Sequence, residues 1–162
     1  MQIRLRETGA VMYESELRSY LRENNGPSFN ALTPEVMEAI GADPVFEGAQ
    51  VTGGTVYQYS QRDGVEQVDG KWYTKYILAP VFTDTEEATA AEQEAAYKAM
   101  KDAEQAKSVR SSRSEKLKDS DWTQVEDAPV DKAAWATYRQ ELRDISAQVG
   151  FPWTVEWPAQ PE

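Results

Sequence analysis

The segment 84–118 constrains the fold of this chain most, because it contains no glycine and no proline and is rich in alanine. Alanine has the highest helix propensity, whereas glycine and proline interrupt helices. Residues 84–97 carry five acidic and no basic side chains, and residues 98–118 carry seven basic and three acidic ones. This distribution complements the partial charges at the two ends of a helix. The segment is therefore predicted to form one long connecting helix.

The alanines of this segment fall roughly on one stripe of the predicted helix, at Ala88, Ala91, Ala95, Ala99, Ala103 and Ala106. Small side chains bury little apolar area, so the stripe gives the helix little support of its own. Two interpretations stay open. The helix is a solvated spacer, or it packs through its small residues against a copy of itself or a partner chain.

Residues 1–83 are predicted to form a small β-rich domain with two short helices. Alternating polar and apolar residues indicate a strand at 2–6, and aromatic and β-branched residues indicate strands at 55–59 and 71–77. Leu17, Tyr20 and Leu21 have helical spacing. Thr33 followed by Pro34 is typical of the start of a second helix.

Two Asp-Gly pairs lie between the strands predicted at 55–59 and 71–77, at Asp63-Gly64 and Asp69-Gly70. Asp-Gly is a strong signal for a tight turn between antiparallel strands. The sequence therefore predicts a small meander in this part of the domain.

Residues 119–162 are predicted to form a small C-terminal helical module with an aromatic tail. An apolar residue recurs at steps of three or four, at Trp135, Tyr138, Leu142, Ile145 and Val149. Asp131 is suited to cap the start of this helix, and Gly150 is predicted to end it. The whole chain is thus expected to be α+β, divided at 1–83, 84–118 and 119–162.

The module holds the residues that we predict to bind a partner: Trp122, Trp135, Tyr138, Phe151, Trp153, Val155 and Trp157. They either form a mini-core of their own or are completed by another chain, because tryptophan and tyrosine are favoured interface anchors. We expect Trp122 and Trp135 to be mainly buried, and Trp153 and Trp157 to be partly at an interface. An extended tail would place Trp153, Val155 and Trp157 on one face, suited to pairing with a partner's sheet.

The composition argues against several classes of function. The chain has no histidine and no cysteine, which removes the commonest general base, the commonest metal ligands and disulfides. Its net charge of -11 is unsuited to binding nucleic acid, and no run of apolar residues is long enough to span a membrane. Neighbouring acidic residues are expected by chance among 28 Asp and Glu. We therefore expect no catalytic residue, cofactor or metal ion, and a binding or assembly protein rather than an enzyme.

Several spaced residues of the module resemble the C-terminal module of bacteriophage tail fibre assembly proteins, which belong with the tail assembly chaperone-like proteins. They are Asp121-Trp122-Thr123-Gln124, Asp127-Ala128-Pro129-Val130, Trp135, Tyr138-Arg139, Leu142-Arg143-Asp144, Phe151-Pro152-Trp153 and Trp157-Pro158. Residues 1–83 are similar, less distinctively, to a module of phage tail proteins.

The resemblance implies a chaperone that binds phage tail fibre chains without covalent chemistry and promotes their folding and trimerisation. We expect it to act in the host cytoplasm, as a homo-oligomer or bound to the fibre trimer, and to be released or retained in the virion tail. The alternative is a permanent tail component, at the fibre tip or baseplate, that contributes to host attachment. A third interpretation, an acidic mimic of nucleic acid, fits poorly with the basic residues of 98–118.

Overall fold

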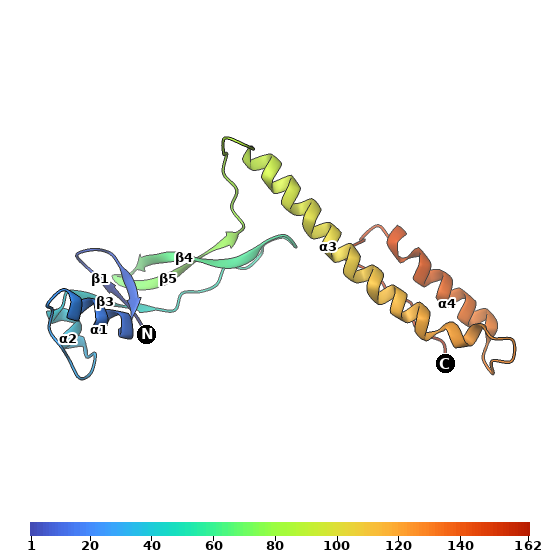
Figure 1. The fold of residues 1–162 in the computed structure, drawn as a ribbon, viewed down its shortest axis with the longest axis horizontal. Coiled ribbons are helices and arrows are strands. Elements are labelled where there is room, and N and C mark those ends of the chain that lie inside the picture. The colour runs from blue at the N-terminus through green and yellow to red at the C-terminus, as the bar shows by residue number, and fades with distance from the viewer. The chain divides into compact units, whose positions relative to one another are not determined.

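A computed structural model describes all residues from Met1 to Glu162, and in it the chain forms two compact units, Met1–Val81 and Phe82–Glu162. The first unit contains a five-stranded sheet and two short helices (Figure 1). The second unit contains the long helix and the C-terminal helical part. The predicted α+β class is therefore confirmed.

The sheet of the first unit has the strand order β2-β1-β3-β5-β4, in which only the β3–β5 pair is parallel. The strands are β1 (Gln2–Leu5), β2 (Val11–Tyr13), β3 (Ala42–Phe46), β4 (Tyr59–Val68) and β5 (Lys71–Ala79). Two helices, α1 (Glu14–Glu23) and α2 (Pro34–Ala39), lie between β2 and β3 along the chain. The buried core of this unit consists of Ile3, Leu5, Leu17, Leu21, Met37 and Ala42.

Both helices form where the sequence predicts them. Leu17 and Leu21 are the buried residues of α1, one helical turn apart, and they pack onto Ile3 and Leu5 of β1. The hydroxyl oxygen of Thr33 accepts a hydrogen bond from the backbone N–H of Val36 at 3.3 Å, so Thr33 caps α2 as expected.

The two Asp-Gly pairs have different roles, which corrects the predicted meander. Asp69-Gly70 forms the turn between β4 and β5, with positive φ angles of 48° and 75°. Asp63-Gly64 instead lies inside β4, where the pairing with β5 shifts register. Gly64 has a φ of 80° there, a conformation that lets a glycine form a bulge without ending a strand. β4 also begins only at Tyr59, so the strand predicted at 55–59 is wrong: residues 55–58 form a loop.

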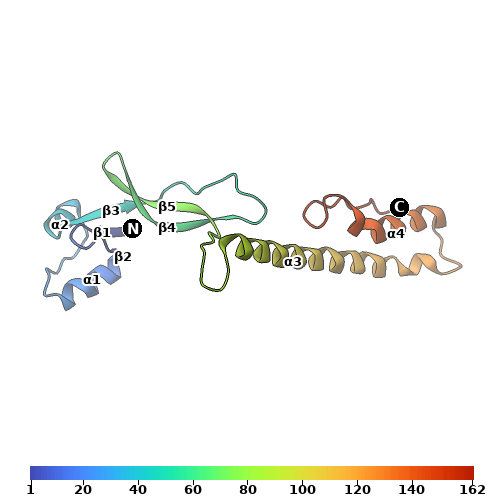
Figure 2. The ribbon, with the colours of Figure 1, turned by 90° about the horizontal axis from the view of Figure 1, so that it is seen from above.

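The second unit is built on an antiparallel helical hairpin. Its elements are α3 (Ala90–Asp119), the short 3₁₀ helix η1 (Asp121–Gln124), α4 (Lys132–Asp144) and a second 3₁₀ helix η2 (Ile145–Ala147). Figures 1 and 2 both show α4 beside the C-terminal half of α3. None of the helices is both long and apolar enough to cross a membrane.

The long helix begins later than the predicted residue 84, because a capping box fixes its start. The Thr89 hydroxyl oxygen accepts from the Glu92 N–H at 3.3 Å, and the Glu92 carboxylate accepts from the Thr89 N–H at 2.9 Å. Hydrogen bonds donated to the Glu92 carboxylate by the backbone N–H and the hydroxyl of Thr89 lower the pKa of Glu92. The carboxylate of Asp84, which was expected inside the helix, accepts from the N–H of Ala90 at 2.7 Å.

The alanine stripe is largely uncovered within its unit. Ala91, Ala95, Ala99 and Ala103 are exposed, and Ala106 is the first alanine along the stripe that is buried. The burial of α3 therefore begins where α4 and the tail pack against it.

Candidate partner-binding surface

The apolar face of α4 forms the core of the second unit together with α3. Trp135, Tyr138 and Leu142 of α4, together with Ile145 at the start of η2, are buried and pack with Val109 of α3, as the spacing of three and four residues predicts. The rings of Trp135 and Tyr138 meet edge to face, with centroids 5.6 Å apart. Of the predicted partner-binding residues, Trp135 and Tyr138 are therefore core residues of this chain.

Helix α4 ends earlier than the sequence predicts. It stops at Asp144, η2 follows, and Val149 is fully exposed instead of continuing the apolar face. Gly150 does not end the helix. It lies where the chain reverses, and a Cβ atom at this position would stand 2.5 Å from the carbonyl oxygen of Thr154. Glycine is required there because the backbone of the tail comes so close.

The residues after η2 fold into a closed turn rather than an extended strand. The N–H of Thr154 donates to the carbonyl of Gly150 at 2.7 Å. The side-chain amide of Gln148 donates to the carbonyl of Glu156 at 2.8 Å and accepts from the N–H of Glu156 at 2.9 Å. Residues 153–157 are not a strand, so the predicted extended ridge of Trp153, Val155 and Trp157 is wrong.

The tail lies against its own long helix. Each of its aromatic residues contacts a charged residue of α3. The indole N–H of Trp153 donates to the carboxylate of Asp102 at 2.5 Å. The guanidinium of Arg110 lies 5.3 Å from the ring centroid of Phe151, and the ammonium of Lys116 lies 5.5 Å from the ring centroid of Trp157. Cations at these distances are attracted by an aromatic ring. Val155 and Phe151 also pack on the hairpin core. The mini-core interpretation therefore accounts for Phe151, Trp153 and Val155.

Arg139 joins α4 to the C-terminal end of α3. Its guanidinium is nearly buried and donates to the carbonyl of Leu117 at 2.7 Å, to the hydroxyl of Ser120 at 2.6 Å and to the carboxylate of Asp121 at 2.8 Å. A cation at the C-terminal end of a helix satisfies carbonyls that lack a partner within the helix. Arg139 therefore fixes the corner of the hairpin from which η1 begins.

The exposure of Trp122, in η1, is where the structure differs most from the expectation. Its side chain is 52% exposed, although it was expected to be mainly buried. The ring lies edge-on to Trp135 with centroids 5.9 Å apart, whereas the neighbouring Thr123 is completely buried and donates its hydroxyl to the carbonyl of Ser120 at 2.7 Å. Because Thr123 points inward at the short turn, Trp122 points outward.

Val125 lies close to Trp122 along the chain and is also 52% exposed. Trp122 and Val125 are flanked by the exposed acidic residues Asp121, Glu126 and Asp127. We call these five residues the hairpin-tip surface. Trp157, which is 38% exposed, is the other predicted partner-binding residue that keeps an accessible ring.

Sequence reasoning did not anticipate Val125, Gln148 or Asp102. Val125 stands outside any periodic pattern, and Gln148 and Asp102 are ordinary polar residues whose partners are known only once the tail is placed. The exposure of Trp122 had one available signal, the short DWTQ segment directly after a long helix. A single turn has room to bury only part of its side chains.

This second unit therefore contains a compact helical hairpin with an aromatic tail and an exposed tryptophan at its tip. Residues 106–162 match the family model described as phage tail assembly chaperone protein. This match covers the C-terminal part of the chain and agrees with the resemblance to tail assembly chaperone-like proteins. Neither the curated proteins nor the solved structures include a match to the chain.

Proposed function

We propose that this protein is a phage tail fibre assembly chaperone that binds fibre chains through the hairpin-tip surface. The family match supports a role in phage tail assembly. The finer statement, that the partner is a fibre chain on its way to a trimer, is our proposal. The protein acts by binding alone, in the host cytoplasm, and not as an enzyme.

The observation that carries the proposal is the exposed ring of Trp122 in the part of the chain that matches the family model. Tryptophan is strongly enriched among the residues that dominate binding energy at interfaces. The edge contact with Trp135 holds the ring in place, so little conformational freedom is lost when a partner covers it. Val125 enlarges the apolar area beside it.

The charge around this apolar centre indicates the chemistry of the partner. Asp121, Glu126 and Asp127 are exposed around Trp122 and Val125, and residues 119–162 carry nine acidic and three basic side chains. A partner surface with an apolar centre and a basic rim fits this arrangement. In the proposed mechanism, such a surface on a fibre chain stays covered until trimerisation buries it.

The test is co-expression of this chain with the tail fibre gene of the same phage, comparing wild type with a Trp122→Ala/Val125→Ser variant. Loss of a central tryptophan costs about 2 kcal/mol or more, which is roughly a 30-fold loss of affinity. We expect the yield of soluble fibre trimer to fall accordingly. Trp122 is a better target than Trp153, because Trp153 holds the tail on α3 and its loss would disturb the fold.

Val149→Ser is the matched control, because Val149 is an apolar residue of the same unit and is fully exposed outside the surface. It should leave the trimer yield unchanged. Wild-type yields from the double variant, with circular dichroism showing that it is folded, would refute the proposed surface. Mass spectrometry of purified virions then separates the two roles: a released chaperone is absent, whereas stoichiometric copies favour a permanent tail component.

A further inference from the structure

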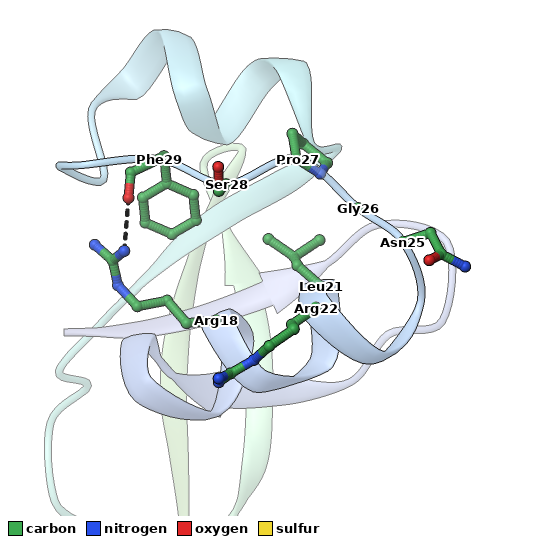
Figure 3. Close-up of a pocket in the computed structure, with 8 residues that line it drawn as sticks. All are labelled: Arg18, Leu21, Arg22, Asn25, Gly26, Pro27, Ser28 and Phe29. Atoms are coloured by element: carbon green, nitrogen blue, oxygen red, sulfur yellow. Dashed lines mark hydrogen bonds between the residues drawn. The ribbon is translucent and has the colours of Figure 1, made fainter.

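A second candidate site lies in the first unit, between α1 and the chain that follows it. A cavity of about 440 Å³ opens there, in the range typical of ligand pockets. Leu21 points from α1 toward the segment 25–29, and the ring of Phe29 points back toward the helix (Figure 3). The cavity therefore has an apolar floor.

Arg18 builds one wall of this cavity and is fully engaged in doing so. Its guanidinium donates to the carbonyls of Phe29 at 2.6 Å and Asn30 at 3.1 Å, and it is paired with the carboxylate of Glu14 at 2.6 Å. It also lies over the ring of Phe29, 4.1 Å from the centroid. The segment opposite α1 is therefore held in position before any ligand arrives.

The segment also approaches α1 closely at Gly26. A Cβ atom at this position would stand 2.7 Å from Cδ2 of Leu21 and 3.2 Å from its Cβ atom and carbonyl oxygen, so a larger residue would require Leu21 to shift. The cavity is thus formed by tight packing at one side and by the Arg18 contacts at the other. A preformed pocket loses little conformational freedom on binding.

Arg22 lies one helical turn after Arg18 and makes far fewer contacts. Its guanidinium makes one long contact, 3.4 Å to the hydroxyl of Ser19, and no ion pair. Four of its five N–H groups therefore remain for a ligand. Asn25 and Ser28, on the facing segment, also line the cavity, with their polar groups directed outward (Figure 3). The rim thus offers one largely unengaged cationic fork beside an apolar floor.

Arg22 also has a purely structural explanation, because a basic residue in the last turn of α1 complements the helix dipole. This accounts for its charge but not for its place beside a cavity lined by Leu21 and Phe29. A guanidinium fork matches a carboxylate in a bidentate geometry. The apolar floor matches a neighbouring apolar group.

We propose that this pocket binds a peptide segment of a partner protein in which a glutamate or aspartate stands next to an apolar residue. Arg22 pairs with the carboxylate, and Leu21 and Phe29 cover the apolar side chain. Arg22, Asn25 and Ser28 are exposed, so a chain can continue past the rim of the pocket, which is why we assign a polypeptide rather than a free carboxylate. This site is separate from the hairpin-tip surface and does not depend on the tail fibre role.

The experiment is an NMR titration of the ¹⁵N-labelled full-length chain with the blocked tripeptide leucyl-glutamyl-phenylalanine. Shifts should concentrate on the amides of Arg22, Asn25 and Ser28. The glutaminyl analogue of the peptide and the variant Arg22→Gln should each bind at least about tenfold more weakly, because each removes the charge-assisted pair. Arg143→Gln is the control, since Arg143 is an exposed arginine of the other unit with one contact of 3.5 Å.

Equal binding of the glutamyl and glutaminyl peptides would overturn the proposal, as would unchanged binding by Arg22→Gln. Phenylacetate is titrated in parallel as a free apolar carboxylate. If it binds as tightly as the peptide and shifts the same amides, the site takes small carboxylates and the polypeptide assignment is wrong. Absence of any shift at about 10 mM peptide would also refute it, because weaker binding would be of little use.

Discussion

Arg139 shows how a single charged residue can define a corner of the fold. It lies almost buried on α4, yet its contacts are all with the end of α3 and the start of η1. The sequence indicates only that it follows Tyr138 on the helix. Its three hydrogen bonds predict that the hairpin corner depends on it.

We therefore expect Arg139→Gln to destabilise the second unit. Hydrogen bonds from charged groups contribute about 1.5–3 kcal/mol each at most, and Asp121 is largely exposed, so a total loss of about 2–3 kcal/mol is expected. Urea unfolding followed by tryptophan fluorescence measures this loss. Arg143→Gln, one turn further on, is the control and should change stability by less than about 0.5 kcal/mol. Equal midpoints for the two variants would contradict the role of Arg139.

In the first unit, Arg6 and Glu38 form an ion pair whose strength depends on pH. Two hydrogen bonds from the Arg6 guanidinium, at 3.1 and 2.6 Å, lower the pKa of the Glu38 carboxyl. A carboxyl with a lowered pKa in the folded state stabilises the fold above its unfolded pKa. That contribution is lost as the pH falls through the folded pKa.

We expect an NMR titration of the Glu38 side chain to give a pKa below the usual value of about 4.3. The variant Arg6→Gln should raise this pKa toward the usual value, whereas Arg22→Gln, which removes an arginine elsewhere in the unit, should not. Because both partners are exposed, the effect on overall stability should be small. An unchanged pKa of Glu38 in Arg6→Gln would rule out the pair as the cause.

At the scale of the element, the tail shows that a short segment can be ordered without regular structure. Two hydrogen bonds between Gln148 and Glu156 close it, and the indole of Trp153 ties it to Asp102 of α3. All of these contacts depend on the reversal at Gly150. The tail is therefore part of the hairpin core and not a free binding strand.

Gly150→Ala tests this arrangement. Its Cβ atom would stand 2.5 Å from the carbonyl oxygen of Thr154, so the turn must open and its hydrogen bond of 2.7 Å is lost. We expect a cost of about 1–3 kcal/mol in urea unfolding, together with faster amide exchange at Glu156. Val149→Ala, at the fully exposed neighbouring position, is the control. Matching stability in both variants would mean that the tail does not need this close approach.

At the scale of the whole molecule, each of the two units has a core of its own. The first core joins the sheet to α1 and α2, and the second joins α3 to α4 and the tail. The family match falls entirely within the second unit, whereas the pocket beside Arg22 lies in the first. The chain thus offers two candidate binding sites, on parts that are built independently.

The sequence by itself determined the features that depend on neighbouring residues along the chain. The long helix, the apolar face of α4 with Ile145 directly after it, the cap at Thr33 and the turn at Asp69-Gly70 all follow from local spacing and backbone preferences. The capping box is also recognisable in the sequence from Thr89 and Glu92, although the prediction started the helix earlier, at residue 84. Local hydrogen bonds fix these features wherever the chain packs.

Only the tertiary structure decided which aromatic side chains are covered. Trp122 is exposed because the buried Thr123 occupies the inside of a short turn, and Trp153 is held because the tail reverses at Gly150 and reaches Asp102. The same holds for the bulge at Gly64, which depends on the pairing with β5. These outcomes depend on residues far apart in sequence, and burial of an apolar ring has no directional preference that local spacing could reveal.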